Sequence, residues 1–124
     1  MTVPSVRFRV DFNRDEAIGP GKIALLEHIA LHGSLSQAAR DLKMSYRRAW
    51  ELLASTNGAF LEKVVLTSKG GRGGGGAQLT QFGRELISSY REFDREVQRR
   101  AARHFSSIAA RARKPPRRPA SGSE

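Results

Sequence analysis

The sequence predicts a small, mainly α-helical domain that carries a small antiparallel β-sheet. Apolar residues recur every three or four positions in four segments of the chain, and this spacing is typical of helices with one buried face. Two shorter apolar segments flank a glycine-rich run, which predicts a hairpin of two antiparallel strands. A chain of 124 residues is long enough for one such domain with a single core.

The chain is strongly basic, with 22 Lys and Arg residues against 12 Asp and Glu residues and a net charge of +10. Such an excess predicts a polyanionic partner, and nucleic acid is favoured over an anionic membrane surface. The alternative is a basic protein that has no polyanionic partner.

Three absences narrow the class of protein. The sequence has no run of about 18 apolar residues and no charged start followed by an apolar stretch, so we expect neither a membrane span nor a signal peptide. The lack of cysteine excludes disulfides, thiolate zinc sites and cysteine nucleophiles. It also fits a reducing cytoplasm, which is the location that we expect.

The N-terminal part of the chain predicts a strand followed by a helix. Residues 5–12 alternate between apolar and polar side chains, which predicts a half-buried strand, and residues 13–19 form a connector. Residues 20–32 follow a helical pattern, with Pro20 suited to the first turn and Gly33 to the position after the last. The side chains predicted to face the core are Val6, Phe8, Val10 and Phe12 from the strand, and Ile23, Leu25, Leu26, Ile29, Ala30 and Leu31 from the helix.

Two short helices follow, separated by about three residues. Ser34 and Gln37 form a capping box at the start of the first helix, which ends near Lys43. Ser45 caps the second helix, which covers residues 46–58. This arrangement is the helix-turn-helix pattern of DNA-binding proteins. The predicted inward residues are Leu35, Ala38, Ala39 and Leu42 on the first helix and Tyr46, Ala49, Trp50 and Leu53 on the second.

Arg47 and Arg48 lie in the first turn of the second helix, at the positive end of its dipole, and are predicted to point outward. A cation at that end costs up to about 1 kcal/mol, which a phosphate or a guanine edge more than offsets. We therefore expect this turn to contact DNA, and the alternative is two solvated arginines. Tyr46 and Trp50 could stack on a base, but their positions in the helical repeat favour the core.

Residues 67–80 read TSKGGRGGGGAQLT and raise the question of phosphate binding. A nucleotide-binding P-loop needs a Gly-Lys-Ser/Thr sequence between a strand and a helix, which the run lacks. Segments 62–67 and 77–80 instead predict the strands of a hairpin, which is called a wing when it adjoins a helix-turn-helix. A glycine-rich tip can approach DNA closely, and the alternative is a surface loop with incidental charge. The candidate contacts at the tip are Lys69, Arg72, Gly73 and Gly74.

A long helix follows the hairpin. Thr80 can cap it, and its apolar residues recur at steps of three and four as far as Phe105. Such a stripe on a helix longer than its domain predicts a two-fold dimer. The domain would then cover residues 1–106, and residues 107–124, rich in Arg and Pro, would form a disordered basic tail. The dimer contacts that we expect are Phe82, Leu86, Tyr90, Phe93 and Val97.

Signals of catalysis or metal binding are weak. His28 and His32 are four residues apart, a spacing that can hold a metal ion on one helix face. No acidic residue or third ligand stands at a recognisable spacing, so a packed or solvated pair is favoured and we predict no metal site. No Ser/His/Asp order or pair of carboxylates suggests catalysis, and we predict neither an enzyme nor a bound cofactor.

Two segments, SLSQAARDLKMSYRRAW and GGRGGGGAQLTQFGRELI, resemble the N-terminal DNA-binding domain of ModE-type molybdate-responsive regulators. That domain is similar to the winged helix-turn-helix domain of LysR-type regulators, and the resemblance covers about residues 5–105. It implies a homodimer that binds a palindromic operator upstream of molybdenum-related genes. It also implies that the major groove receives Ser45, Tyr46, Arg47 and Arg48, and that the DNA backbone or minor groove is contacted by Lys69 and Arg72.

One departure from that family is large. Its members carry molybdate-binding domains after this one, whereas this sequence continues into a basic tail, so we expect no direct molybdate binding. The prediction is a dimeric winged helix-turn-helix regulator of transcription that binds double-stranded DNA, with molybdenum uptake or molybdoenzyme genes as candidate targets. The alternatives are a nucleoid-like protein that coats DNA without regard to sequence and a small phosphate-handling enzyme. The predicted DNA-binding set is completed by Ser36 and Gln37.

Overall fold

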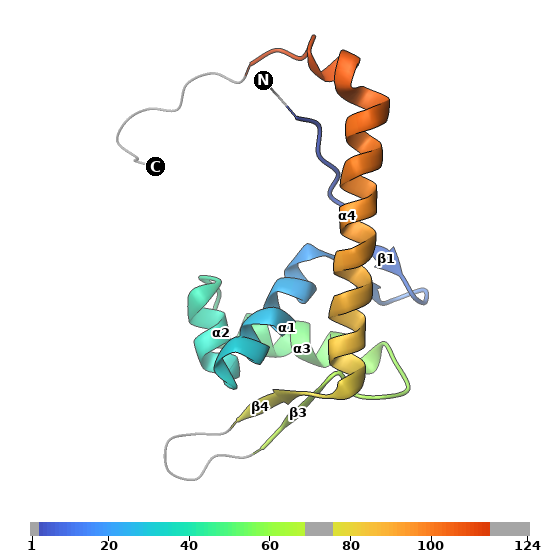
Figure 1. Cartoon of the computed structure of the whole chain (residues 1–124). Coiled ribbons are helices and arrows are strands. Elements are labelled where there is room, and N and C mark those ends of the chain that lie inside the picture. The colour runs from blue at the N-terminus through green and yellow to red at the C-terminus, as the bar shows by residue number, and fades with distance from the viewer. Residues whose placement is uncertain (1–2, 69–75, 115–124) are drawn as a thin grey trace, which may run out of the picture. The chain divides into compact units, whose positions relative to one another are not determined.

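The fold is built mainly from helices, with two short β-ladders (Figure 1). The computed structural model describes residues 3–68 and 76–114. It confirms the predicted class, mainly α with a winged helix arrangement, although the strands form two two-stranded antiparallel sheets rather than one. The elements are, in order, β1 (Val10–Asp11), β2 (Ala17–Ile18), α1 (Pro20–His32), α2 (Leu35–Asp41), α3 (Tyr46–Gly58), β3 (Val65–Thr67), β4 (Ala77–Leu79) and α4 (Gln81–Ala109).

The chain divides into two compact units, of which Arg7–Asp94 form the larger. The helix α4 begins in this unit and ends in the smaller one, which also includes the N-terminal residues up to Val6. Within the smaller unit, the side-chain amide of Gln98 donates to the Val6 carbonyl at 2.8 Å and accepts from the Val6 N–H at 3.0 Å. This pair of bonds holds the N-terminal segment on α4 in the way that a neighbouring strand would.

The first strand is much shorter than the strand predicted over residues 5–12. β1 contains only Val10 and Asp11, and it pairs with β2, which lies in the segment predicted to be a connector. The side chain of Asn13 closes the turn between the two strands by accepting hydrogen bonds from two backbone N–H groups, at 2.9 and 3.0 Å. A two-residue ladder is the result, because the chain turns back so soon after Asp11.

Phe8 explains why the alternating pattern does not extend the ladder toward the N-terminus. Its ring stacks on Tyr90 of α4 with 4.8 Å between centroids and meets Phe93 edge-on at 5.3 Å. Its carbonyl accepts a hydrogen bond from the Tyr90 hydroxyl at 2.9 Å, and burial raises the pKa of that hydroxyl, which keeps it a donor. The alternation therefore reflects the docking of an aromatic side chain onto a helix.

The first helix, α1, has the predicted bounds. Gly33 follows it in the left-handed conformation, with φ 66°, and its N–H donates to the Ile29 carbonyl at 2.7 Å. Two residues of the predicted inner face are exposed instead. Leu31 lies on the opposite side of the helix from Ile29 and is 72% exposed. Ala30 borders an open cavity of about 630 Å³ between α1 and the β3–β4 hairpin.

The core of the larger unit lies where α1, α2 and α3 meet one another and the β3–β4 hairpin (Figure 1). Each large aliphatic side chain buried there contributes about 1.5–3 kcal/mol through the hydrophobic effect. Alanines on α2 and α3 let these helices approach closely. The core residues are Ile18, Ile23, Leu25, Leu26, Ile29, Leu35, Ala38, Ala39, Ala49, Leu53, Val64, Val65, Ala77, Leu79, Leu86 and Tyr90.

Thr80 joins the hairpin to the start of α4 and confirms the predicted cap. Its hydroxyl accepts from the Gly83 N–H at 2.9 Å and donates to the Lys63 carbonyl at 2.7 Å, while its own N–H donates to the Val64 carbonyl at 3.0 Å. A Cβ on Gly83 would lie 2.3 Å from the same Val64 oxygen. The first turn of α4 can therefore approach the backbone before β3 only if position 83 has no side chain.

We predict that Gly83→Ala lowers the free energy of unfolding by about 1–3 kcal/mol, because the added methyl group overlaps the Val64 carbonyl. Urea denaturation followed by circular dichroism measures the change. Gly21→Ala is the matched control, since Gly21 also lies near a helix start and a Cβ there meets nothing within 4 Å. Equal stabilities of the two variants would contradict the close approach.

The last helix, α4, continues to Ala109, so residues 107–109 are helical rather than part of the expected tail. The sequence there favours this continuation, because apolar Ile108 and Ala109 precede any proline. Residues 115–124, which make up most of the predicted disordered tail, lie outside the described residues. Across the described ranges no helix is both long and apolar enough to cross a membrane.

Candidate nucleic-acid interface

The start of α2 confirms half of the predicted capping box. The Ser34 hydroxyl accepts from the Gln37 N–H at 3.1 Å, but the Gln37 side chain bonds within α2, donating to Asp41 and accepting from Arg40, each at 3.2 Å. Ser36 is exposed, with its hydroxyl 3.3 Å from that of Ser34. Of the two α2 residues predicted to contact DNA, Ser36 is accessible, whereas Gln37 would have to give up bonds that it already makes.

The turn between α2 and α3 contains a residue in a conformation that side chains rarely adopt. Lys43 has φ 57°, which costs roughly 1–2 kcal/mol for a residue other than glycine. Its N–H donates to the Arg40 carbonyl, and the Met44 N–H donates to the Ala39 carbonyl, both at 3.0 Å. These bonds satisfy carbonyl groups at the end of α2. The tight turn then leads into α3, which packs against both α1 and α2.

The first turn of α3 presents two cations to solvent, as the sequence predicted. The Ser45 hydroxyl caps the helix by accepting from the Arg48 N–H at 3.0 Å. The Arg47 side chain is 89% exposed and pairs with Glu51 across one turn, with 3.4 Å between Nε and Oε2. Among the described residues no carboxylate pairs with the Arg48 guanidinium. The N-terminal end of α3, which disfavours cations, therefore carries Arg47 in a weak ion pair and Arg48 without an acidic partner in the described part of the chain.

Two aromatic side chains of α3 are exposed, and our prediction that they belong to the core is wrong. Tyr46 is 56% exposed and Trp50 is 55% exposed. The inward face of α3 is narrow, because only Ala49, Leu53 and Thr56 are fully buried and only Leu52 packs beside them against the core. Tyr46 and Trp50, four residues apart, lie together at the edge of that face. Both rings are therefore accessible from solvent.

Asn57, near the end of α3, holds the hairpin to this helix. Its Oδ1 accepts from the Val64 N–H at 2.7 Å and the Val65 N–H at 3.2 Å, and its Nδ2 donates to the Val65 carbonyl at 3.2 Å. One side chain thus makes the hydrogen bonds that an adjacent strand would make to β3. No sequence pattern indicates this role, because an asparagine before the terminal glycine of a helix is equally typical of an ordinary helix end.

The hairpin predicted around the glycine run is present, with shorter strands than expected. β3 and β4 pair in the register Val65↔Leu79, Leu66↔Gln78 and Thr67↔Ala77. Beyond the ladder, the Ser68 N–H donates to the Gly76 carbonyl at 2.9 Å, and the Gly76 N–H donates to the Ser68 hydroxyl at 3.1 Å. The four predicted contacts at the tip lie outside the described residues: Lys69, Arg72, Gly73 and Gly74.

The apolar stripe predicted for a dimer is partly used within one chain. Leu86 and Tyr90 are 8% and 6% exposed and belong to the core of the larger unit, and Phe82 packs against that core. Phe93 remains 48% exposed, and Val97, in the smaller unit, is half-buried. Of the predicted dimer contacts, Phe93 therefore presents the most accessible apolar surface.

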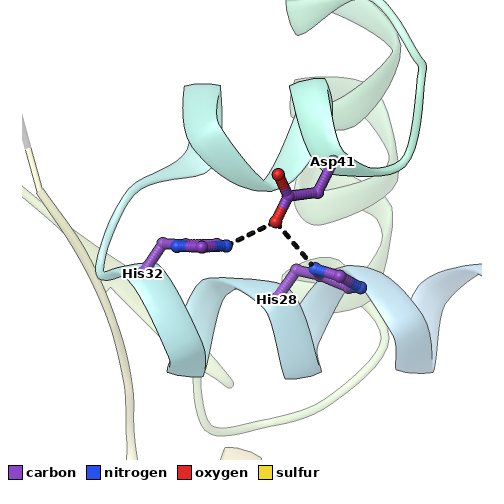
Figure 2. A group of neighbouring side chains, drawn as sticks. All are labelled: His28, His32 and Asp41. Atoms are coloured by element: carbon purple, nitrogen blue, oxygen red, sulfur yellow. Dashed lines mark hydrogen bonds and ion pairs between the residues drawn. The ribbon is translucent and has the colours of Figure 1, made fainter.

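A side-chain cluster that the sequence analysis did not predict lies between α1 and α2 (Figure 2). His28 Nδ1 is 3.2 Å from Asp41 Oδ2, and His32 Nε2 bonds the same oxygen. The bond from His32, followed by that from Gln37, holds the pKa of Asp41 below its usual value. The sequence shows no acidic residue at a recognisable spacing from the histidine pair, but the fold supplies one in Asp41. Asp41 is nine residues beyond His32, and the turn from α1 into α2 brings it over the pair.

The helix pair α2–α3, followed by the β3–β4 hairpin, has the arrangement of a winged helix-turn-helix domain. The chain is 46% identical over 71 residues to the DNA-binding transcriptional dual regulator ModE of Escherichia coli, a match to 57% of the chain and 27% of that protein. It is 37% identical over 92 residues to the molybdenum transport protein ModE of Azotobacter vinelandii, covering 74% of the chain and 34% of that protein. No model of a protein family matches the chain.

A further relative is the molybdenum-pterin-binding protein MopA of Rhodobacter capsulatus, 40% identical over 73 residues, with 59% of the chain and 28% of MopA covered. These matches confirm the resemblance to ModE-type proteins. They fall in the N-terminal part of the relatives, so the chain is a homologue of an N-terminal domain of this type. The aligned part spans about a quarter to a third of the length of these relatives.

We predict that Asn57→Ala lowers the free energy of unfolding by about 3 kcal/mol, because it removes three hydrogen bonds worth about 1 kcal/mol each from half-buried groups. Chemical denaturation measures the loss. Asn13→Ala is the matched control: that side chain also accepts from two backbone N–H groups, but at an exposed turn where water can replace it. If both variants lose the same stability, Asn57 is not the clamp that holds the hairpin to α3.

Proposed function

We propose that this chain is the DNA-binding part of a transcription regulator and reads a specific duplex with α3. The observation that carries the proposal is the first half of α3, where Arg47, Arg48, Tyr46 and Trp50 are all exposed at the positive end of a helix. The net charge of +10 and the ModE relative of E. coli, which is named as a DNA-binding transcriptional regulator, support it. A regulator of this kind works in the cytoplasm and performs no catalysis.

Arg47 would gain more free energy from a contact with a DNA base than from its ion pair with Glu51. An exposed ion pair such as Arg47–Glu51 contributes about 0–1 kcal/mol. A bidentate contact from an arginine to a guanine contributes roughly 1–3 kcal/mol of discrimination. Exchange of Glu51 for a base is therefore favourable, and Arg48 has no ion pair among the described residues to give up.

The exposed aromatics give α3 a second kind of contact. A Tyr or Trp side chain at the edge of a groove can pack against a thymine methyl group or a deoxyribose ring, which releases water from apolar surface on both sides. Tyr46 and Trp50 lie next to Arg47 on the helix surface, so apolar and cationic contacts would fall on neighbouring base pairs. Ser45 and Ser36 lie at helix starts, where hydroxyls and backbone N–H groups bind phosphate.

The hairpin would supply phosphate contacts from its tip, with Lys69 and Arg72 as the cations and Gly73 and Gly74 allowing close approach. The Asn57 bonds support this, since they fix the base of the hairpin to the reading helix. For the assembly we propose a homodimer through α4 in which Phe93 and Val97 contribute more than the buried Leu86 and Tyr90. Two recognition helices about 34–36 Å apart would then meet successive turns of a palindrome.

The regulated genes are proposed from the relatives alone. Two of them are named as a molybdenum transport protein and a molybdenum-pterin-binding protein, which favours genes of molybdenum uptake or of molybdoenzymes as targets. We further propose that this chain does not bind molybdate directly. Its cations would then serve DNA rather than an oxyanion.

We predict that selection from a random duplex library enriches a palindromic sequence, and that Arg48→Ala weakens binding to that sequence by about 1–3 kcal/mol. Fluorescence anisotropy at fixed salt measures the affinity. Arg14→Ala, which removes the same charge from the exposed β1–β2 turn, is the matched control and should change affinity little. Failure to enrich any sequence, with equal effects of the two variants, would favour a nucleoid-like coater of DNA. Turnover of a nucleotide would favour the phosphate-handling enzyme.

We predict a dimer at micromolar concentration, weakened when Phe93, 48% exposed on α4, is replaced by serine. Analytical ultracentrifugation measures the dimer–monomer equilibrium. Leu61→Ser is the control, because Leu61 is fully exposed and lies outside α4. A monomer in the unaltered protein, or an equal effect of both substitutions, would exclude α4 as the dimer contact.

A further inference from the structure

The cluster of His28, His32 and Asp41 has the composition and spacing of a transition-metal site. One ligand atom from each residue can be chosen so that all three lie within 4.8 Å of one another. Figure 2 shows the two imidazoles of α1 directed toward the carboxylate that α2 holds above them. Around a tetrahedral ion with bonds of about 2.0–2.2 Å, ligand atoms stand roughly 3.3 Å apart. The 3.2 Å between His28 Nδ1 and Asp41 Oδ2 is close to that separation, whereas His32 Nε2, which lies closer to the same oxygen, would have to move away from it to admit the ion.

The carboxylate is oriented from its far side. Asp41 Oδ1 accepts from the Gln37 side-chain amide at 3.2 Å, and this leaves Oδ2 to face the two histidines. Gln37 is fixed in turn by Arg40, which donates to its side-chain oxygen at 3.2 Å. Outer hydrogen bonds of this kind set the direction of ligands in metal sites, and their removal typically weakens metal binding 10–100-fold.

The exposure of the three side chains and the identity of their ligand atoms indicate which metal ions fit the cluster. The side chains of His28, His32 and Asp41 are 32%, 28% and 29% exposed, so an ion can enter from solvent and keep a water as its fourth ligand. Two imidazole nitrogens favour Zn²⁺, Ni²⁺, Co²⁺ or Cu²⁺ over Mg²⁺ and Ca²⁺, which prefer oxygen ligands. A chain with a net charge of +10 also gives no general attraction to cations, so binding there would depend on the ligands themselves.

We propose that His28, His32 and Asp41 bind a first-row divalent transition-metal ion, with Zn²⁺ as the reference case. The ion replaces the hydrogen bonds from the two imidazoles to Asp41 and connects α1 to α2. It therefore stabilises the larger unit, because a ligand that binds only the folded chain shifts the unfolding equilibrium. The proposal does not depend on DNA binding, since none of the three residues belongs to the predicted DNA contacts.

The test uses the full chain, freed of metal by a chelator. Isothermal titration with Zn²⁺ should give one site per chain in the micromolar range or tighter, and Co²⁺ should give the visible absorption of a tetrahedral ion. Zn²⁺ should raise the midpoint of thermal unfolding, and Mg²⁺ at the same concentration should not. His32→Gln and Asp41→Asn keep the size and polarity of their side chains, and each should weaken Zn²⁺ binding at least about tenfold.

His104→Gln is the matched control. His104 is the third histidine of the chain and is exposed on α4, so its replacement should leave Zn²⁺ affinity unchanged. Circular dichroism confirms that each variant is folded before titration. The proposal is overturned if the unaltered chain shows no saturable Zn²⁺ binding, or if His32→Gln binds Zn²⁺ as tightly as His104→Gln does. In either case the three residues serve only as a hydrogen-bonded link between α1 and α2.

Discussion

The position of the hairpin relative to α3 depends on the hydrogen bonds of the Asn57 side-chain amide. This amide bonds two N–H groups and one carbonyl at the start of β3, and so it joins the helix that presents the cations to the hairpin that carries the glycine run. A hairpin of two three-residue strands is marginally stable by itself. Here its base is fixed by Asn57 on one side and by Thr80 and Gly83 of the α4 start on the other.

The narrow packing face of α3 determines which of its side chains are exposed. Because α3 meets its neighbours through alanine, leucine and threonine, the helix lies close to α1 and α2 and leaves most of its circumference to solvent. Tyr46 and Trp50 are consequently exposed. We propose one explanation for the exposed aromatics and the cations at the start of α3, namely a partner that offers both apolar surface and negative charge, as a DNA groove does.

Local signals predicted the helices well. Pro20 and Gly33 mark the two ends of α1, and Ser45 and Gly58 mark those of α3. These ends were predictable because a helix end is determined by residues within one turn of it. The exposure of Tyr46 and Trp50 was not predictable from periodicity. Both lie at the edge of the apolar face of α3, and the width of the part that is buried depends on how α1 and α2 pack against it. Asp41 bonds His32, nine residues away along the chain, and Asn57 bonds Val64 and Val65, seven and eight residues away. Each contact crosses a turn between two elements, and no periodic pattern predicts it.

In the proposed function, α3 and the β3–β4 hairpin together form one DNA-binding face. The most direct measurement is a titration of ¹⁵N-labelled protein with a duplex recovered by selection, followed by amide chemical shifts. The account predicts that the largest changes fall in residues 45–51 and in β3 and β4, with the β1–β2 turn unaffected. Changes concentrated in the β1–β2 turn, with α3 unmoved, would contradict it.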